Sequence, residues 1–295
     1  MKRKLIALAL TAALSLSAAL SLTACGDKKS DSSDAAETNT SITIAIPNDA
    51  TNGGRALLLL DDLGYIKLKD NANITATVLD IAENPKNIEF KEVEAAQVPN
   101  VRQDVDYAVI NTNYALEAKL SPAKDALALE GAQSPYVNVL VVKEGNENSD
   151  KIKALAAALE SQKVVDFINT KYNNEVVPVV ENPTNGFDDS VDYDSLKGTK
   201  ISVAATPVPH AEILAIVKDI LAEKDITLDI IEFTDYVQPN NVVESGEVDA
   251  NYFQHTPYLN NFNEENKTHL VVVSGIHVEP IGLYGGKQST LDALQ

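Results

Sequence analysis

The sequence predicts an α/β fold, because runs typical of strands alternate with runs typical of helices almost throughout residues 41–295. This region is long enough for one large domain or two smaller ones, and the 44% apolar fraction of the chain is ordinary for a globular protein. Such alternation favours mainly parallel sheets covered by helices.

Strands are expected where short runs are rich in β-branched residues, and helices where longer runs carry a wide apolar side. In the first part the expected strands are Ser41–Pro47, Ile74–Leu79, Val105–Ile110 and Val137–Val142, and the expected helices are Gly54–Leu63, Ile152–Leu159 and Val164–Tyr172. In the second part the expected strands are Lys200–Ala204, Thr227–Phe233, Ala250–Phe253, Leu270–Val273 and Val278–Tyr284, and the expected helix is Ala211–Ala222.

The first 24 residues predict a lipoprotein signal peptide. A basic start is followed by a long apolar run, and Leu22-Thr23-Ala24-Cys25 reads as a lipobox. A transmembrane anchor is the alternative, since the run approaches a membrane span in length. A cysteine that ends the run and is followed by a polar tether, residues 25–40, favours lipid modification instead. Acylation of Cys25, for example with palmitate, would hold the protein on the extracytoplasmic face of the cell membrane.

The formal charge of −19 becomes more negative once the basic signal is removed. This charge argues against nucleic acid and against charge-driven binding to anionic lipid as partners. Cys25 is the sole cysteine, so no disulfide can form within one copy.

The body resembles the methionine-binding lipoproteins of the NlpA type, which are substrate-binding components of ABC importers. The resemblance covers nearly all of residues 41–180 and 198–294. It is carried in the first part by IPNDATNGGRALLLL, AENPKNIEF, EAAQVP, DYAVINTNYAL, AKDALALE and SPYVNVLVVKEG, and in the second by TPVPHAEIL, EFTDYVQPN, VDANYFQHTPYL and VEPIGLY.

The order of these blocks departs from the family, in which the second part precedes the first. The chain therefore looks circularly permuted. The acidic stretch 181–197, rich in Asn, Asp, Gly and Pro, is expected to be a surface linker at the join.

The resemblance implies a two-lobed, periplasmic-binding-protein-like fold with a ligand cleft between two α/β domains. One lobe is expected from residues 41–138 plus 285–295, with Arg55 and Asn111. The other is expected from residues 139–180 plus 198–284, with Tyr236, His255 and Tyr258.

Three polar residues are candidate ligands for the backbone groups of an amino acid. Arg55 is expected at the start of a helix, where a guanidinium fork and free N–H groups suit a carboxylate. Asn111 ends the strand-like run DYAVIN, and Asn138 interrupts an apolar run that reads as a buried strand. A surface arginine near a helix start is the alternative for Arg55, and a turn cap is the alternative role for either asparagine. The resemblance implies ligand contact for all three.

The resemblance also implies a side-chain wall of Tyr236, Phe253, His255 and Tyr258, in which aromatic edges suit a thioether. Ordinary core packing is the alternative for each of these residues. Glu279, in VEPIGLY, is expected as an acceptor at or behind the ligand ammonium, or as a residue that orients others across the hinge.

The function expected is capture of L-methionine, or a close relative, and delivery to an ABC permease and its ATPase by a monomeric lipoprotein. An amino-acid-binding surface lipoprotein that acts as sensor or adhesin is the alternative. No enzymatic activity and no cofactor are expected. A metal site is not expected either, because the four histidines lack HxxxH spacing and cysteine companions.

Overall fold

The computed structural model describes residues 41–131 and 135–295, and the expectations for residues 1–40, Cys25 included, lie outside this range. Residues 41–131 and 135–295 belong to one compact unit. It contains a five-stranded sheet, a six-stranded sheet and a small two-stranded ribbon. No helix within the described residues is long and apolar enough to cross a membrane.

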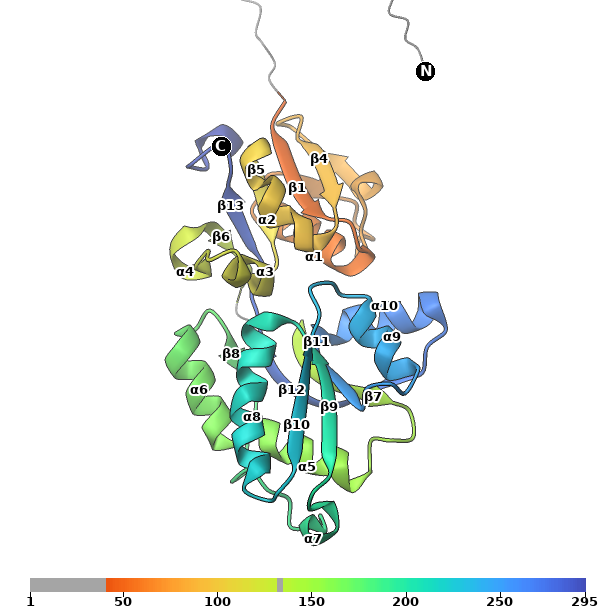
Figure 1. Ribbon diagram of the computed structural model, residues 1–295. Helices are drawn as coiled ribbons and strands as arrows, with labels where there is room; N and C mark the ends of the chain where they lie inside the picture. Colours follow the sequence, from red (N-terminus) through yellow and green to blue (C-terminus); the bar gives the residue numbers. More distant parts are fainter. Residues whose placement is uncertain (1–40, 132–134) are drawn as a thin grey trace, which may run out of the picture. The chain divides into compact units, whose positions relative to one another are not determined.

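The five-stranded sheet forms lobe one, which comprises residues 41–131 and 282–295 (Figure 1). Its strand order is β4-β1-β5-β13-β6. The strands of this lobe, including the ribbon β2-β3, are β1 Thr43–Pro47, β2 Lys67–Leu68, β3 Ile81–Glu83, β4 Glu89–Val93, β5 Tyr107–Ile110, β6 Ala126–Leu129 and β13 Gly282–Gly285. Its helices and helical turns are α1 Ala50–Asp62, η1 Val78–Asp80, η2 Ala95–Gln97, α2 Val98–Val101, η3 Arg102–Asp104, α3 Thr112–Glu117, α4 Pro122–Asp125 and η5 Asp292–Leu294.

The six-stranded sheet forms lobe two, residues 135–278, with strand order β10-β9-β11-β7-β12-β8 (Figure 1). Its strands are β7 Val137–Lys143, β8 Val177–Pro178, β9 Lys200–Ala205, β10 Thr227–Glu232, β11 Ala250–His255 and β12 Leu270–Val278. Its helices are α5 Asp150–Leu159, α6 Gln162–Tyr172, α7 Tyr193–Leu196, the π-helical turn η4 Pro207–Ala211, α8 Glu212–Ala222, α9 Gln238–Glu244 and α10 Thr256–Asn266.

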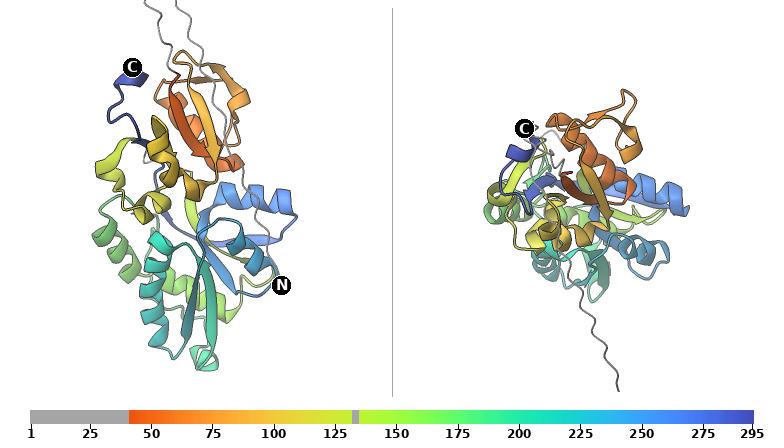
Figure 2. Two further views of the ribbon diagram at one scale, coloured as in Figure 1. Left: turned by 45° about the horizontal axis from the view of Figure 1, so that its top comes forward. Right: turned by 90° about the horizontal axis from the view of Figure 1, so that it is seen from above.

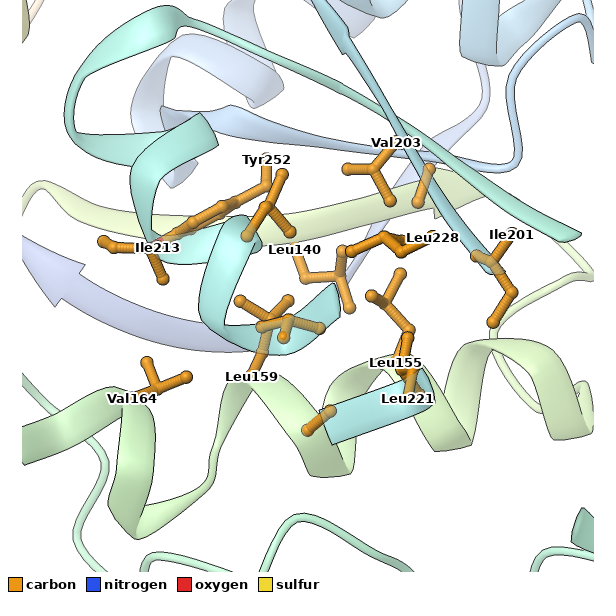
Figure 3. Close-up of a cluster of buried hydrophobic side chains, with 14 of the residues drawn as sticks. Leu140, Leu155, Leu159, Val164, Ile201, Val203, Ile213, Leu221, Leu228 and Tyr252 are labelled. Carbon is orange, nitrogen blue, oxygen red and sulfur yellow. The ribbon is translucent and has the colours of Figure 1, made fainter. Parts of the chain in front are cut away.

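In lobe two, successive side chains of each central strand point to opposite faces of the sheet, as the pleat of a strand requires, and both faces are apolar. On β7, Leu140 joins the core under α5, α6 and α8 (Figure 3). Val142 belongs to the same core. Val139 and Val141 point to the opposite face, where α9 and α10 pack. Helices therefore cover both faces, as the α/β prediction requires.

Lobe one is built in the same way around β1. Ile44 and Ile46 pack on the α1 side, whereas Ala45 packs on the side covered by α2 and α3. Residues near the end of the chain complete the first of these cores, because the buried Leu294 belongs to the same core cluster as Ile44. Figure 2 accordingly places the C-terminus beside this lobe.

The α/β class is confirmed, but the sheets are mixed instead of mainly parallel. β1 runs parallel to β4 and β5, and β9 runs parallel to β10 and β11. The remaining ladders of the two large sheets, made by β6, β7, β8, β12 and β13, are antiparallel.

The expected lobe boundaries are shifted by a few residues. Val137 and Asn138 belong to β7 and so to lobe two, although they were expected in the other lobe. Residues 282–284, expected in lobe two, lie in β13, which pairs with β5 and β6 of lobe one. Pairing partners decide these boundaries, and an apolar run alone does not reveal them.

Two local predictions are wrong. Ile74–Leu79 forms turns and the start of η1 instead of a strand, and the Ile74 carbonyl oxygen lies so close to α1 that a Cβ on Gly54 would approach it to 2.4 Å. The stretch 181–197 is not simply a surface linker, because Val191 and Leu196 are buried in the lobe-two core.

Candidate functional site

A cavity with an empty volume of about 340 Å³, the interlobe cavity, is lined by residues of both lobes and of the crossover 279–281. The lining residues are Asn52, Arg55, Asn111, Thr112 and Asn113 of lobe one, Asn138, Tyr236, Phe253, Gln254, His255 and Tyr258 of lobe two, and Glu279 of the crossover.

The structure brings all eight sequence-predicted residues together around this cavity. Asn52, Thr112, Asn113 and Gln254 also line it and were not predicted. Asn52 and Asn113 lie within the quoted blocks IPNDATNGG and VINTNYA, so a clustering of amides in these blocks was the available signal.

Arg55 is buried but does not lie at a helix start, contrary to expectation. Helix α1 begins at Ala50, and its first turn is capped by the Asp49 side chain, which accepts a hydrogen bond from the Asn52 backbone N–H at 2.9 Å. Arg55 therefore lies in the second turn of α1. Its contribution is the guanidinium itself and not the N-terminal N–H groups of the helix.

The Arg55 guanidinium is held on one edge by Glu130, a residue that was not among the candidates predicted from the sequence. Nε donates to one carboxylate oxygen at 3.0 Å and Nη2 donates to the other. Nη2 also donates to the Glu279 carbonyl at 2.7 Å, and the guanidinium stacks on the Tyr136 ring at 4.0 Å. Nη1 is the guanidinium nitrogen that these bonds leave unused, so the group presents a fixed donor.

An amide chain joins the lobes at the cavity. Asn111 Nδ2 donates to Asn52 Oδ1 at 2.7 Å, and His255 Nε2 lies 3.1 Å from the same oxygen. His255 Nδ1 accepts a hydrogen bond from the Tyr258 backbone N–H, which caps α10. His255 therefore carries its proton on Nε2 and donates it to Asn52 across the lobes. Burial keeps this imidazole neutral by lowering the pKa of His255 well below its usual range.

A second bond between the lobes joins Tyr236 to Asn113. The Tyr236 hydroxyl donates to Asn113 Oδ1 at 2.6 Å, and the Tyr236 ring lies 4.9 Å from the Tyr114 ring. Tyr114 in turn donates to the Thr234 carbonyl at 3.2 Å. Lobe one thus meets the loop before α9 through hydrogen bonds and ring contacts.

Two buried polar atoms on residues that line the cavity lack a partner. Among the described residues, four buried side-chain polar atoms make no hydrogen bond, and two of them, Asn111 Oδ1 and Asn113 Nδ2, belong to residues that line this cavity. One is an acceptor and the other a donor. Buried polar groups in proteins are ordinarily paired, so a ligand with both kinds of group would satisfy them.

Aromatic rings form one wall of the cavity, as expected. The Tyr236 ring lies 5.9 Å from Phe253 and 5.7 Å from Tyr258, and Phe253 lies 6.1 Å from Tyr258. The register of β11 against β7 shifts between Tyr252 and Gln254, a bulge that frees Phe253 from strict alternation. This wall offers ring edges to an apolar, polarizable side chain.

Behind the lobe-two side of the cavity lies a buried network that the sequence did not predict. His210 Nε2 lies 3.0 Å from Asn138 Oδ1 and 3.4 Å from Glu279 Oε1. His277 Nε2 lies 2.7 Å from the same Glu279 oxygen. Burial opposes the charge of Glu279, but the imidazoles, the His277 hydrogen bond and Arg55 outweigh it and lower the pKa of this carboxyl.

The side-chain nitrogen and oxygen atoms of His210, His277 and Glu279 that could coordinate a metal ion lie within 4.8 Å of one another. Sequence spacing gave no reason to expect this meeting, because the histidines are on η4 and on β12. The short His277–Glu279 contact at 2.7 Å is a hydrogen bond, and the set is satisfied by hydrogen bonds as it stands.

The sequence model of the family described as NlpA lipoprotein matches residues 30–180 and 201–295. The chain is 46% identical over 136 residues to the D-methionine-binding lipoprotein MetQ of Yersinia pestis, covering 45% of this chain and 50% of that protein. It is 43% identical over 138 residues to Lipoprotein 28 of Escherichia coli K12, covering 46% and 51%. The chain thus spans about half the length of the curated relatives it matches.

Solved structures with similar segments include a nutrient-binding protein from Burkholderia cenocepacia bound to methionine, at 47% identity, 48% and 59% coverage of the two chains and a TM-score of 0.45. Lipoprotein Tp32 from Treponema pallidum matches at 42% identity, 47% and 58% coverage and a TM-score of 0.44. Since the family model covers most of this chain in its two segments, the protein belongs to the NlpA lipoprotein family.

Proposed function

We propose that this protein is an extracytoplasmic solute-binding lipoprotein that captures L-methionine, or a close relative, in the interlobe cavity and delivers it to an ABC importer. The observation that carries the proposal is the pair of unpartnered buried atoms, Asn111 Oδ1 and Asn113 Nδ2, on residues that line the interlobe cavity. An ammonium group would satisfy the acceptor, and a carboxylate would satisfy the donor.

The surrounding charges support the same ligand. Arg55 offers Nη1 to a carboxylate, while Glu279 offers negative charge to an ammonium. The ring wall of Tyr236, Phe253 and Tyr258 suits a thioether side chain. The names of the relatives, a D-methionine-binding lipoprotein and a nutrient-binding protein bound to methionine, point to the same class of ligand.

The mechanism we infer is closure of the lobes around the ligand. Asn111 and Arg55 belong to lobe one, and the ring wall belongs to lobe two, so a ligand contacts both walls only when the lobes are closed. Such a ligand shifts the population toward the closed form. A permease with its ATPase would then recognise that form. The protein binds and releases its ligand and performs no chemistry on it.

We infer further that Cys25 is acylated and anchors a monomer to the membrane, and that the order of the two parts is permuted. The family match in two segments on either side of residues 181–200 supports a join in that stretch. Packing of both Ile42 and Leu291 against one lobe-one core supports a shared location for the two ends of the body.

Calorimetry tests the proposed function. The chain from Gly26 onward is unfolded, freed of retained ligand, refolded, and titrated with L-methionine, D-methionine and a glycyl-methionine dipeptide. Saturable one-to-one heat with any of them supports the proposal and identifies the ligand. A folded protein that gives no heat with all three overturns it.

A sensor or adhesin without transport duty would possess the same cavity. Uptake of labelled methionine by cells with and without the gene separates the two functions. Loss of uptake supports delivery to an importer, whereas unchanged uptake with intact binding supports the sensor or adhesin.

A further inference from the structure

The buried network behind the cavity contains two histidines, His210 and His277, that are respectively 1% and 0% exposed. Neither lines the interlobe cavity, but each contacts a residue that does. Their positions raise the question of which ring nitrogen carries the proton, because that choice fixes the polarity of the residues in front of them.

Both Nε2 atoms face the same oxygen of Glu279, at 3.4 Å from His210 and 2.7 Å from His277. The pKa of this carboxyl is lowered, and with both imidazoles neutral the Arg55 guanidinium is a cation beside it that favours the ionised form. A ring nitrogen that turned its lone pair toward a carboxylate oxygen would be repelled, whereas an N–H is attracted. Both imidazoles therefore carry hydrogen on Nε2.

The opposite ring nitrogens have hydroxyl partners that fit this assignment. Thr206 Oγ1 lies 2.7 Å from His210 Nδ1, and the Tyr252 hydroxyl lies 2.5 Å from His277 Nδ1. Burial raises the pKa of the Tyr252 phenol well above its usual value and lowers the pKa of His210 to about 3. The phenol therefore keeps its proton and donates it, and the His210 ring stays neutral.

The tautomer of His210 then fixes the amide of Asn138. Because His210 Nε2 donates, the amide presents its oxygen to the ring at 3.0 Å. Its Nδ2 group is consequently directed away from His210 on a residue that lines the cavity. Glu279 likewise uses Oε1 for the histidines, which leaves Oε2 for another partner.

We propose that His210 and His277 are positioning residues that lock Asn138 as a donor and Glu279 as an acceptor, and that they thereby select ligands bearing both a carboxylate and a free ammonium. This inference rests on the proposed function, since it assigns the selectivity of the same cavity. It assigns to these two histidines the discrimination against analogues that lack a free ammonium or a carboxylate.

The test compares two ligands in matched variants of the chain from Gly26 onward. L-methionine and 4-(methylthio)butanoate, which lacks the amino group, are titrated into the wild type, His277→Gln and His277→Leu. Glutamine retains an N–H donor toward Glu279 and leucine does not. His269→Leu, at an exposed histidine whose side chain is 65% accessible, is the control for the substitution itself.

His277→Leu removes the N–H donor, and it should weaken L-methionine binding roughly tenfold to a hundredfold, which corresponds to the loss of one charge-assisted hydrogen bond. The affinity for the deaminated analogue should change less than about twofold. His277→Gln should restore most of the preference. Equal weakening for both ligands would indicate a purely structural role and overturn the inference, while leaving the proposed function standing.

His210 is tested in the same way against methioninol, which lacks the carboxylate. His210→Leu should weaken L-methionine more than methioninol, and His210→Gln should restore the difference. Identical losses for the two ligands would contradict the assignment of Asn138 as a fixed donor.

Nitrogen-detected NMR of the imidazoles provides a test that needs no ligand. The Nε2–H tautomer for both His210 and His277 is expected in the refolded protein. An Nδ1–H tautomer, an imidazolium, or a stoichiometric transition metal found by elemental analysis would overturn the inference. If L-methionine does not bind the wild type, the proposed function fails. The NMR measurement still decides whether both imidazoles carry hydrogen on Nε2.

Discussion

The guanidinium of Arg55 and the carboxylate of Glu130 form a two-point ion pair beside the interlobe cavity, although they are 75 residues apart in the chain. The Arg55 side chain is 4% exposed and the Glu130 side chain 17%. This pair fixes the plane of the guanidinium, so that a ligand carboxylate meets an oriented donor and does not have to order it.

Arg55→Ala should weaken L-methionine binding by roughly a hundredfold or more, because a charge-assisted hydrogen bond to the ligand carboxylate is lost. Calorimetry at constant salt measures the change. Arg102→Ala is the matched control, since Arg102 donates to the Gly285 carbonyl at 2.6 Å and does not line the cavity. Equal affinities for the wild type and Arg55→Ala would show that another group holds the carboxylate.

Tyr236→Phe removes the hydroxyl that donates to Asn113 across the lobes at 2.6 Å. Loss of one such hydrogen bond should weaken ligand binding roughly fivefold. Because the closed form is then less populated, the weakening should appear mainly as faster ligand release. Stopped-flow release of L-methionine measures it. Tyr193→Phe, which alters a hydroxyl bonded to the Asp188 N–H in the linker, should leave the rate unchanged.

Norleucine, in which a methylene replaces the sulfur, should bind about two- to tenfold more weakly than L-methionine, because the favourable sulfur–aromatic contact is lost. The Phe253→Leu variant should narrow this difference, since Phe253 is part of the ring wall. Competition calorimetry gives both ratios. Norleucine binding as tight as methionine would argue against selection for a thioether.

The free energy of unfolding should fall as the pH is lowered below about 6.5. Burial lowers the pKa of His210 from 6.5 to about 3, so between these values the unfolded chain binds a proton that the folded chain does not. The expected slope from His210 is about 1.4 kcal/mol per pH unit, and His255 contributes in the same direction. The raised pKa of Asp49 works in the opposite direction and offsets part of the slope.

Urea unfolding at several pH values between about 7 and 4.5 measures this slope. His210→Gln should flatten it, because the substituted side chain does not titrate. His269→Gln, at an exposed position, is the control. A stability that is constant over this range in the wild type would contradict the assignment of neutral buried imidazoles.

The sequence determined the α/β class, the family and the eight residues that the structure gathers at the cavity. Local patterns sufficed for these elements because apolar periodicity is a property of consecutive residues. The helices α5, α6 and α8 begin within two residues of their predicted starts. The eight site residues came from the resemblance, which preserves the identity of residues that meet in space.

The tertiary structure alone decided what those residues contact. His255 and Asn52 are 203 residues apart in the chain, and Tyr236 and Asn113 are 123 residues apart. In both pairs, the sequence around one residue gives no indication of its partner. Strand direction and the placement of β13 in lobe one followed from the path of the chain between the sheets. A hydrogen bond of this kind depends on where two distant backbones come together, and that is settled by packing the whole body.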